Sequence, residues 1–158
     1  MTLKISFSTD IPAPIAEVWR RLIDFDRWGE WHPHRSLVGK AQLRARVVHV
    51  TPRAHALRRK TPCRIDVLED ERCLSFKFGR WLTGYSFERF ELTPSKTGTR
   101  LTQVAVVPSW TAALNGGRER YEASVKEAYR QSASGLTRHL GGARPVKRRA
   151  IPKTRSRL

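Results

Sequence analysis

Cysteine is scarce in this chain, and its scarcity narrows the chemistry to be considered. The 158 residues include only Cys63 and Cys73, whose spacing matches no metal-ligand pattern. A disulfide between them is the alternative to two free thiols, and a reducing compartment favours the thiols. We therefore expect no bound metal.

Long apolar runs and targeting signals are also missing. No segment reaches the roughly 18 apolar residues that a membrane-spanning helix needs, and the N-terminus lacks the apolar core of a signal peptide. The sequence contains no glycine-rich phosphate loop, metalloprotease motif or nucleophile elbow. We therefore expect cytoplasmic residence and no cofactor, and the sequence leaves open whether the protein is an enzyme.

Acidic residues are few relative to basic ones. The chain carries 31 basic and 14 acidic side chains, for a net charge of +17. Residues 141–158 hold seven basic residues and no acidic or aromatic one, which predicts a disordered tail after a folded domain of residues 1–140. Such a tail would make weak, salt-sensitive contact with nucleic acid or an anionic membrane, whereas generic solubility is the plainer interpretation of the charge.

The periodicity of the apolar residues changes along the first third of the chain. They alternate along residues 3–11, which is typical of a half-buried strand. Between residues 15 and 22 they follow the spacing i, i+3, i+4, i+7 of one helix face. A second short helix is expected over residues 26–31, where Pro33 stops it.

The middle of the chain predicts a meandering antiparallel sheet. Short alternating segments separated by turn residues run from about residue 42 to 107, beginning with residues 43–47. The clearest pair covers residues 84–93 and 99–107. An apolar-striped segment, residues 118–140, then predicts a helix roughly 35 Å long at 1.5 Å per residue.

Three segments carry further local patterns. They are Ile-Pro-Ala-Pro-Ile-Ala-Glu-Val-Trp at 11–19, Phe-Asp-Arg-Trp-Gly-Glu-Trp-His-Pro at 25–33, and a strand–turn–strand at 87–102. In this order they resemble the two helix entries and the penultimate hairpin of the START-like superfamily, also called the polyketide cyclase/dehydrase or SRPBCC family. The resemblance covers residues 3–140. It implies an α+β helix-grip fold, in which a curved antiparallel sheet of about seven strands wraps around a long C-terminal helix, with two short helices after the first strand.

The resemblance also implies a cavity between the last helix and the sheet for an apolar or amphipathic small molecule, and no universal catalytic residue. The helix stripe agrees, because Val125, Ala128 and Ser132 are small enough to leave space against a curved sheet. Pockets of this kind usually enclose about 300–1,000 Å³. The alternative is close packing, with aromatic side chains of the sheet filling the gap.

Glu88 is the most informative acidic residue. It shares a strand face with Phe90, so a buried face there would place a carboxylate among apolar neighbours, raise its pKa and suit it for acid–base catalysis. Two alternatives remain. Glu88 pairs with a cross-strand arginine such as Arg100 or Arg64, or it is solvated.

The other candidates are polar or aromatic residues near the expected cavity. Gln103 is suited to binding a ligand carbonyl or to bridging strands, and His32 to proton transfer, although a surface histidine is the favoured interpretation. Trp31 is interpreted as a packing residue more than a stacking one. The full candidate ligand-binding set is Trp31, His32, Phe76, Glu88, Phe90, Gln103, Trp110, Tyr121, Val125, Ala128 and Ser132.

Three functions are compatible with these features. The first is a binding module for an apolar or amphipathic small molecule. The second is a cyclase or dehydratase of the polyketide kind, with Glu88 as its acid–base group. The third is a basic interaction protein that binds RNA or an anionic membrane.

Overall fold

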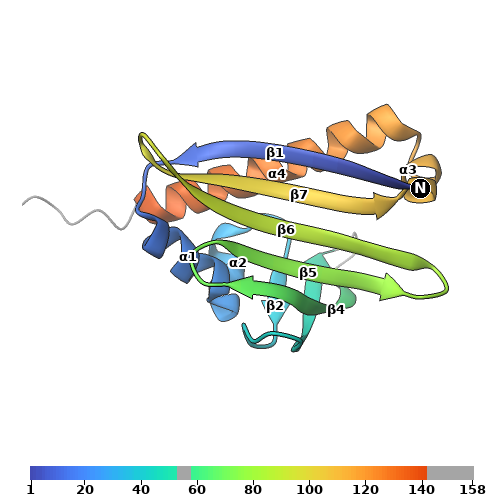
Figure 1. The fold of residues 1–158 in the computed structure, drawn as a ribbon, viewed down its shortest axis with the longest axis horizontal. Helices are drawn as coiled ribbons and strands as arrows, with labels where there is room; N and C mark the ends of the chain where they lie inside the picture. Colours follow the sequence, from blue (N-terminus) through green and yellow to red (C-terminus); the bar gives the residue numbers. More distant parts are fainter. Residues whose placement is uncertain (53–57, 142–158) are drawn as a thin grey trace, which may run out of the picture.

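A computed structural model describes residues 1–52 and 58–141. The strands are β1 (Thr2–Ile11), β2 (Ser36–Val38), β3 (Arg46–Pro52), β4 (Arg58–Glu69), β5 (Cys73–Arg80), β6 (Gly84–Ser95) and β7 (Gly98–Pro108). The helices are α1 (Ile15–Ile23), the 3-10 turn η1 (Phe25–Arg27), α2 (Trp28–Trp31), α3 (Ser109–Leu114) and α4 (Arg118–Gly141). The strands form one antiparallel sheet in the order β1-β7-β6-β5-β4-β3-β2 (Figure 1). The predicted helix-grip fold is confirmed.

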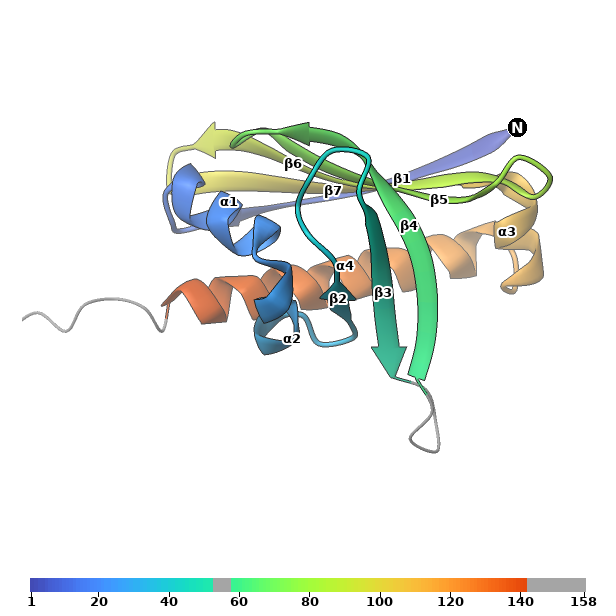
Figure 2. The same cartoon turned by 90° about the horizontal axis from the view of Figure 1, so that it is seen from below.

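The sheet curves over α4. Figure 2 shows α4 running beneath β1, β7 and β6, while β3 and β4 bend down across it and α1 and α2 lie at one end. Alternation along the strands gives the sheet two different faces, and the apolar, concave face is the one that covers α4. Thus Ile5 on β1 and Ile65 on β4 are each 1% exposed, whereas Lys4 and Arg64 beside them are exposed.

One predicted boundary is wrong. Residues 43–47 were expected to be a strand, but β3 begins only at Arg46 and continues to Pro52. The cause is Arg44, which has a left-handed φ of 66° and whose backbone N–H donates to the carbonyl of Ile65. A residue in the left-handed region interrupts a strand, so β3 starts after Arg44. The buried face of β3 therefore carries Val47 and His49.

The two halves of α4 pack differently. Every buried residue of this helix lies from Tyr129 onward, and residues 118–128 include none that is buried. In the C-terminal half, Gly135 sits so close to α2 that a Cβ atom there would lie 2.1 Å from the carbonyl oxygen of Trp31. This half of α4 is therefore fixed against α2, whereas the N-terminal half leaves space beside the sheet.

The two cysteines lie at separate places in the sheet. Cys63 pairs with Phe78 across β4 and β5, while Cys73 pairs with Glu69 at the other end of the same two strands. Both thiols are free, as predicted. None of the helices in the described residues combines the length and apolar character needed to span a membrane.

Candidate functional site

A buried ion pair lies at the centre of the concave face. Nη1 of Arg35 donates to Oε2 of Glu88 at 2.6 Å, and Nη2 donates to the other carboxylate oxygen, so the pair is bidentate. The two side chains are only 16% and 10% exposed. Arg35 follows α2 and reaches across to β6, which ties the helical segment to the middle of the sheet.

Two buried histidines complete the surroundings of Arg35. Its Nε atom donates to Nε2 of His32 at 3.2 Å, and its Nη1 atom lies 3.0 Å from Nδ1 of His49. His32 stacks on Trp28 with 5.6 Å between ring centroids, and His49 lies edge-on to Phe76 at 4.8 Å. A guanidinium thus occupies the position between two imidazoles and a carboxylate. In residues 1–52 and 58–141, no three His, Cys, Asp or Glu side chains are arranged so that they could hold a metal ion.

The protonation states follow from this geometry. Burial alone disfavours a charged carboxylate, but the charge of Arg35 and its hydrogen bonds outweigh burial and hold the pKa of Glu88 below its ordinary value. Burial and the Arg35 charge lower the pKa of His32 and of His49 to about 3. At neutral pH the cluster therefore consists of one cation, one anion and two neutral imidazoles. The predicted rise in the pKa of Glu88 is wrong, because the sequence argument lacked its cation.

A pocket of about 240 Å³ opens beside this cluster, between the N-terminal half of α4 and strands β5 to β7. Its walls are mainly apolar, and polar groups are contributed by Ser86, Glu88, Tyr121 and Tyr129. Burial and the Glu88 carboxylate raise the pKa of Tyr129 well above its ordinary value, so its hydroxyl stays protonated. The lining residues are Phe78, Ser86, Phe87, Glu88, Ala105, Val107, Tyr121, Val125, Ala128 and Tyr129.

The pocket is smaller than expected, because the interior under α4 is partly a cavity and partly closely packed. Aromatic side chains of the sheet, together with Trp28 of α2, fill the space under the C-terminal half of α4, where Trp28 and Phe76 are 0% exposed and Phe90 is 1% exposed. The pocket beside Glu88 is therefore confined to residues 121–129 of α4, and a separate pocket of about 380 Å³ lies between β1 and residues 130–138 of the same helix. The volume of the pocket beside Glu88 falls below the predicted range of about 300–1,000 Å³.

Four of the predicted site residues meet in this pocket, namely Glu88, Tyr121, Val125 and Ala128. Gln103 and Ser132 are buried but bind each other, since Oγ of Ser132 donates to Oε1 of Gln103 at 2.9 Å. Nε2 of Gln103 also donates to the backbone carbonyl of Tyr129 at 3.1 Å. These two residues therefore fasten α4 to β7, and their polar groups are already used.

The remaining predicted residues lie away from the pocket. Phe76, Phe90 and Trp31 belong to the hydrophobic core. Trp110 lies on α3, is 53% exposed and does not line the pocket. The preference for a surface histidine at position 32 is wrong, because His32 is 6% exposed and contacts Arg35.

Sequence reasoning missed Arg35, His49 and the position of Tyr129 in the pocket. A buried carboxylate needs a cation, and only arginines on neighbouring strands were considered. Those arginines have other partners: Nε of Arg100 donates to Asp10 at 2.9 Å, and Arg64 donates to the Arg44 carbonyl. The histidine at position 49 would have been found by extending the alternation of β3 by two residues.

Comparison with solved structures supports the fold. A protein from Nitrosomonas europaea superposes with a TM-score of 0.72 at 16% identity, covering 89% of this chain and 95% of that one. A protein from Rhodobacter sphaeroides gives 0.72 at 14% identity, with 90% and 95% covered. The di-domain aromatase/cyclase StfQ of the steffimycin biosynthetic pathway gives 0.63 at 14% identity, with 87% and 49% covered.

At the level of sequence, no curated protein matches the chain. A family model does match it, and the family is described as "Polyketide cyclase / dehydrase and lipid transport". The match extends from residue 2 to residue 141 and so includes every strand and helix described above. The chain therefore belongs to the polyketide cyclase/dehydrase and lipid transport family.

Proposed function

We propose that this protein binds a small apolar or amphipathic molecule in the pocket between α4 and the sheet. The observation that carries the proposal is a mainly apolar pocket whose polar side chains include Glu88 and Tyr129. Removal of apolar surface from water supplies affinity at about 25 cal/mol per Å². The two polar groups would orient the ligand, as in most small-molecule sites.

The chemistry of the two polar side chains defines the ligand class. Because each oxygen of the Glu88 carboxylate has a lone pair that its Arg35 hydrogen bond does not use, a ligand hydroxyl can donate to Glu88 beside the protonated phenol of Tyr129. An anionic head group would instead be repelled by Glu88. A volume of about 240 Å³ holds a compact ligand, or one end of a longer molecule whose remainder projects past the exposed Ala128.

Binding has better support than catalysis. A cyclase or dehydratase, as the family description and the name of StfQ suggest, requires a group that gives or takes a proton. Both oxygens of Glu88 accept hydrogen bonds from Arg35, and its lowered pKa makes it a poor acid. We therefore place an enzyme of that kind second. Cytoplasmic residence remains part of the proposal, and the two free thiols support it.

For the third function, contact of the tail, residues 141–158, with RNA or an anionic membrane has no structural support. Apart from Gly141, the tail lies outside the described residues.

The test uses 1-naphthol, which is compact, apolar and neutral and carries one hydroxyl group. Val125 lines the pocket and is half-buried, so a Val125→Trp variant fills the space without disturbing the core. Ala123 is exposed on the same helix and does not line the pocket, so Ala123→Trp is the matched control.

Isothermal titration should show binding to the wild type and to Ala123→Trp, and at least a roughly tenfold loss in Val125→Trp. Equal binding by all three proteins would contradict the proposal, as would no binding by the wild type. Native mass spectrometry of the purified protein would add the identity of any retained molecule.

A further inference from the structure

A second groove lies between β4 and β5 and has a volume of about 530 Å³. Pairing of β4 with β5 ends at Cys63 and Phe78, whereas β5 and β6 stay paired as far as Arg80 and Gly84. Beyond that point β4 bends away from β5 (Figure 2). We call the opening the cation groove; its lining residues are Arg46, Pro62, Cys63, Arg64, Lys77, Gly79, Arg80, Trp81 and Tyr85.

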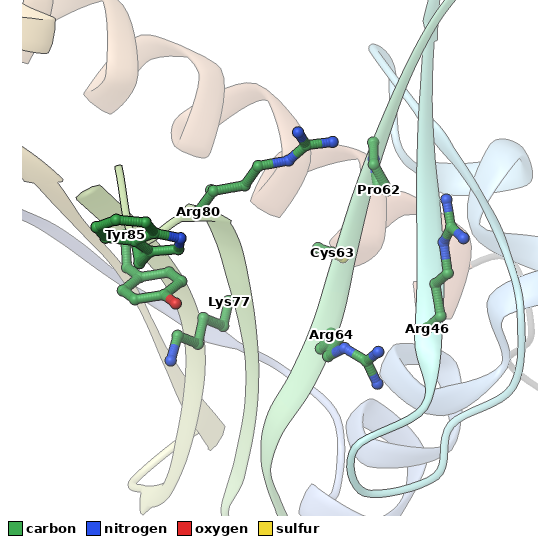
Figure 3. Close-up of a pocket in the computed structure, with 9 residues that line it drawn as sticks. Arg46, Pro62, Cys63, Arg64, Lys77, Arg80 and Tyr85 are labelled. Carbon is green, nitrogen blue, oxygen red and sulfur yellow. The ribbon is translucent and has the colours of Figure 1, made fainter. Parts of the chain in front are cut away.

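Three of its cations stand in one row across three strands. Arg46 of β3 is directly opposite Arg64 of β4, and Arg64 is directly opposite Lys77 of β5. With about 4.8 Å between neighbouring strands, the row is about 10 Å long. Figure 3 shows a fourth cation, Arg80, directed across the opening toward Pro62.

The row is unfavourable for the free protein. Like charges directly opposite each other destabilise a sheet. Among the described residues no carboxylate lies within 4.0 Å of Arg46, Arg64, Lys77 or Arg80, although such pairs occur elsewhere on the surface. A bound anion would remove this repulsion, and neutralising these charges is what a phosphate-bearing ligand does.

Aromatic side chains lie beside the cations. Trp81 is 78% exposed at the turn between β5 and β6, and Tyr85 is 40% exposed. The ammonium of Lys77 lies 3.8 Å from the centroid of the Tyr85 ring, which holds both side chains in place. Gly79 fixes this turn, since its φ is +94° and a Cβ atom there would lie 2.3 Å from the Gly84 carbonyl oxygen. A large exposed indole next to a cation row has no packing role.

We propose that the cation groove binds a single strand of nucleic acid. Its phosphates contact the row Arg46, Arg64 and Lys77 together with Arg80, and a base stacks on Trp81. Stacking on an aromatic ring beside a positive groove suits any base sequence, because every base has a π-face. The site is separate from the ligand pocket, so this inference does not depend on the proposed function.

The shape and charge of the groove favour this occupant over two others. A flat anionic bilayer reaches protruding side chains but not a cleft between diverging strands. A free nucleotide offers too few phosphates to span a row about 10 Å long. The net charge of +17 adds long-range attraction that acts most strongly on a polyanion.

The test measures binding of a short fluorescein-labelled oligouridylate to the full chain by fluorescence anisotropy. Arg46→Gln/Arg64→Gln/Arg80→Gln removes three groove charges. The control, Arg20→Gln/Lys96→Gln/Arg138→Gln, removes three exposed charges from α1, the β6–β7 turn and α4. Both variants keep the same net charge and the same basic tail. Circular dichroism confirms that each is folded.

For the wild type, the logarithm of the binding constant should fall with the logarithm of the salt concentration. Three groove contacts should contribute a slope of about −2 to this dependence. The groove variant should lose that slope and bind on the order of 100-fold more weakly at about 50 mM salt, while the control retains most of the affinity. Trp81→Ala should weaken binding without changing the salt dependence, and Trp81→Phe should restore the affinity.

Any of three results would overturn the inference. The first is that the wild type does not bind the oligonucleotide, and the second is that the control loses as much affinity as the groove variant. The third is that UMP displaces the labelled oligonucleotide as well as an equimolar amount of unlabelled oligonucleotide does. Vesicles of phosphatidylglycerol form a further arm. If they bind through the groove charges while the oligonucleotide does not, the partner is a membrane and the inference is wrong.

Discussion

Replacing Arg35 with methionine removes the cation from a buried carboxylate while keeping an unbranched side chain of similar length. Breaking a buried pair by deleting one partner costs about 3–5 kcal/mol, because the remaining charge is left without compensation. The 16% and 10% exposure of the two side chains admits some water, so we expect a loss near the lower limit, about 3 kcal/mol. A domain with about 5–15 kcal/mol of stability would still fold.

The second step of the experiment is the Arg35→Met/Glu88→Gln double variant. This double variant has no uncompensated buried charge. Its loss of unfolding free energy should therefore be about 2 kcal/mol smaller than the sum of the losses in the two single variants. Urea unfolding followed by tryptophan fluorescence, to which the buried Trp19, Trp28 and Trp31 contribute, gives the free energies of unfolding. The solvent-exposed pair of Asp10 and Arg100 is the control, and its coupling should be much smaller than that of the buried pair.

The pH dependence of the single variant provides an independent check. Without Arg35, burial raises the pKa of Glu88 in the folded state above its unfolded value, so the protonated form favours folding. The penalty of Arg35→Met relative to the double variant should therefore shrink as pH falls from 7 toward the unfolded pKa near 4.5. Additive single losses, or a penalty that does not vary with pH, would refute the assignment of a buried ion pair.

Two further predictions concern acid stability and helix packing. Because the pKa values of His32 and His49 fall from 6.5 when unfolded to about 3 when folded, both take up protons only on unfolding, and stability is lost as pH falls through that window. Between about pH 6 and pH 5 the free energy of unfolding should fall by about 2–3 kcal/mol per pH unit; His32→Gln/His49→Gln should flatten this dependence, and the exposed His34→Gln should not. Gly135→Ala places a Cβ atom 2.1 Å from a backbone oxygen and should cost about 2 kcal/mol in urea unfolding. Gly141→Ala, with nothing within 4 Å, should be neutral, and equal effects of the two alanines would show that α4 is not fixed at this point.

Patterns within one element predicted the fold well. The helix expected at residues 118–140 is α4 at Arg118–Gly141, and the strongest hairpin became β6 and β7. Such signals are local, since each depends on a period of 2 or 3.6 residues. The shared burial of Glu88, Phe90 and Leu92 followed from the same alternation.

Contacts between distant elements could not be predicted in this way. Arg35 meets Glu88 across 53 residues, and nothing in either segment alone specifies the other. The pocket volume depends on how far Trp28 and Phe76 extend beneath α4, which is a property of three-dimensional packing. The left-handed conformation of Arg44 shifted the start of β3, and it could not be predicted because arginine gives no sign of a positive φ.

The unequal packing of α4 determines where a ligand can enter the pocket. The half from Tyr129 onward is buried and held by the close contact at Gly135, while residues 118–128 rest on the sheet through half-buried side chains only. The first turns of this helix can therefore fray or tilt outward at little cost while the rest stays docked. Amide hydrogens in these turns will exchange with solvent faster than those near Leu136, and an occupied pocket will slow them selectively.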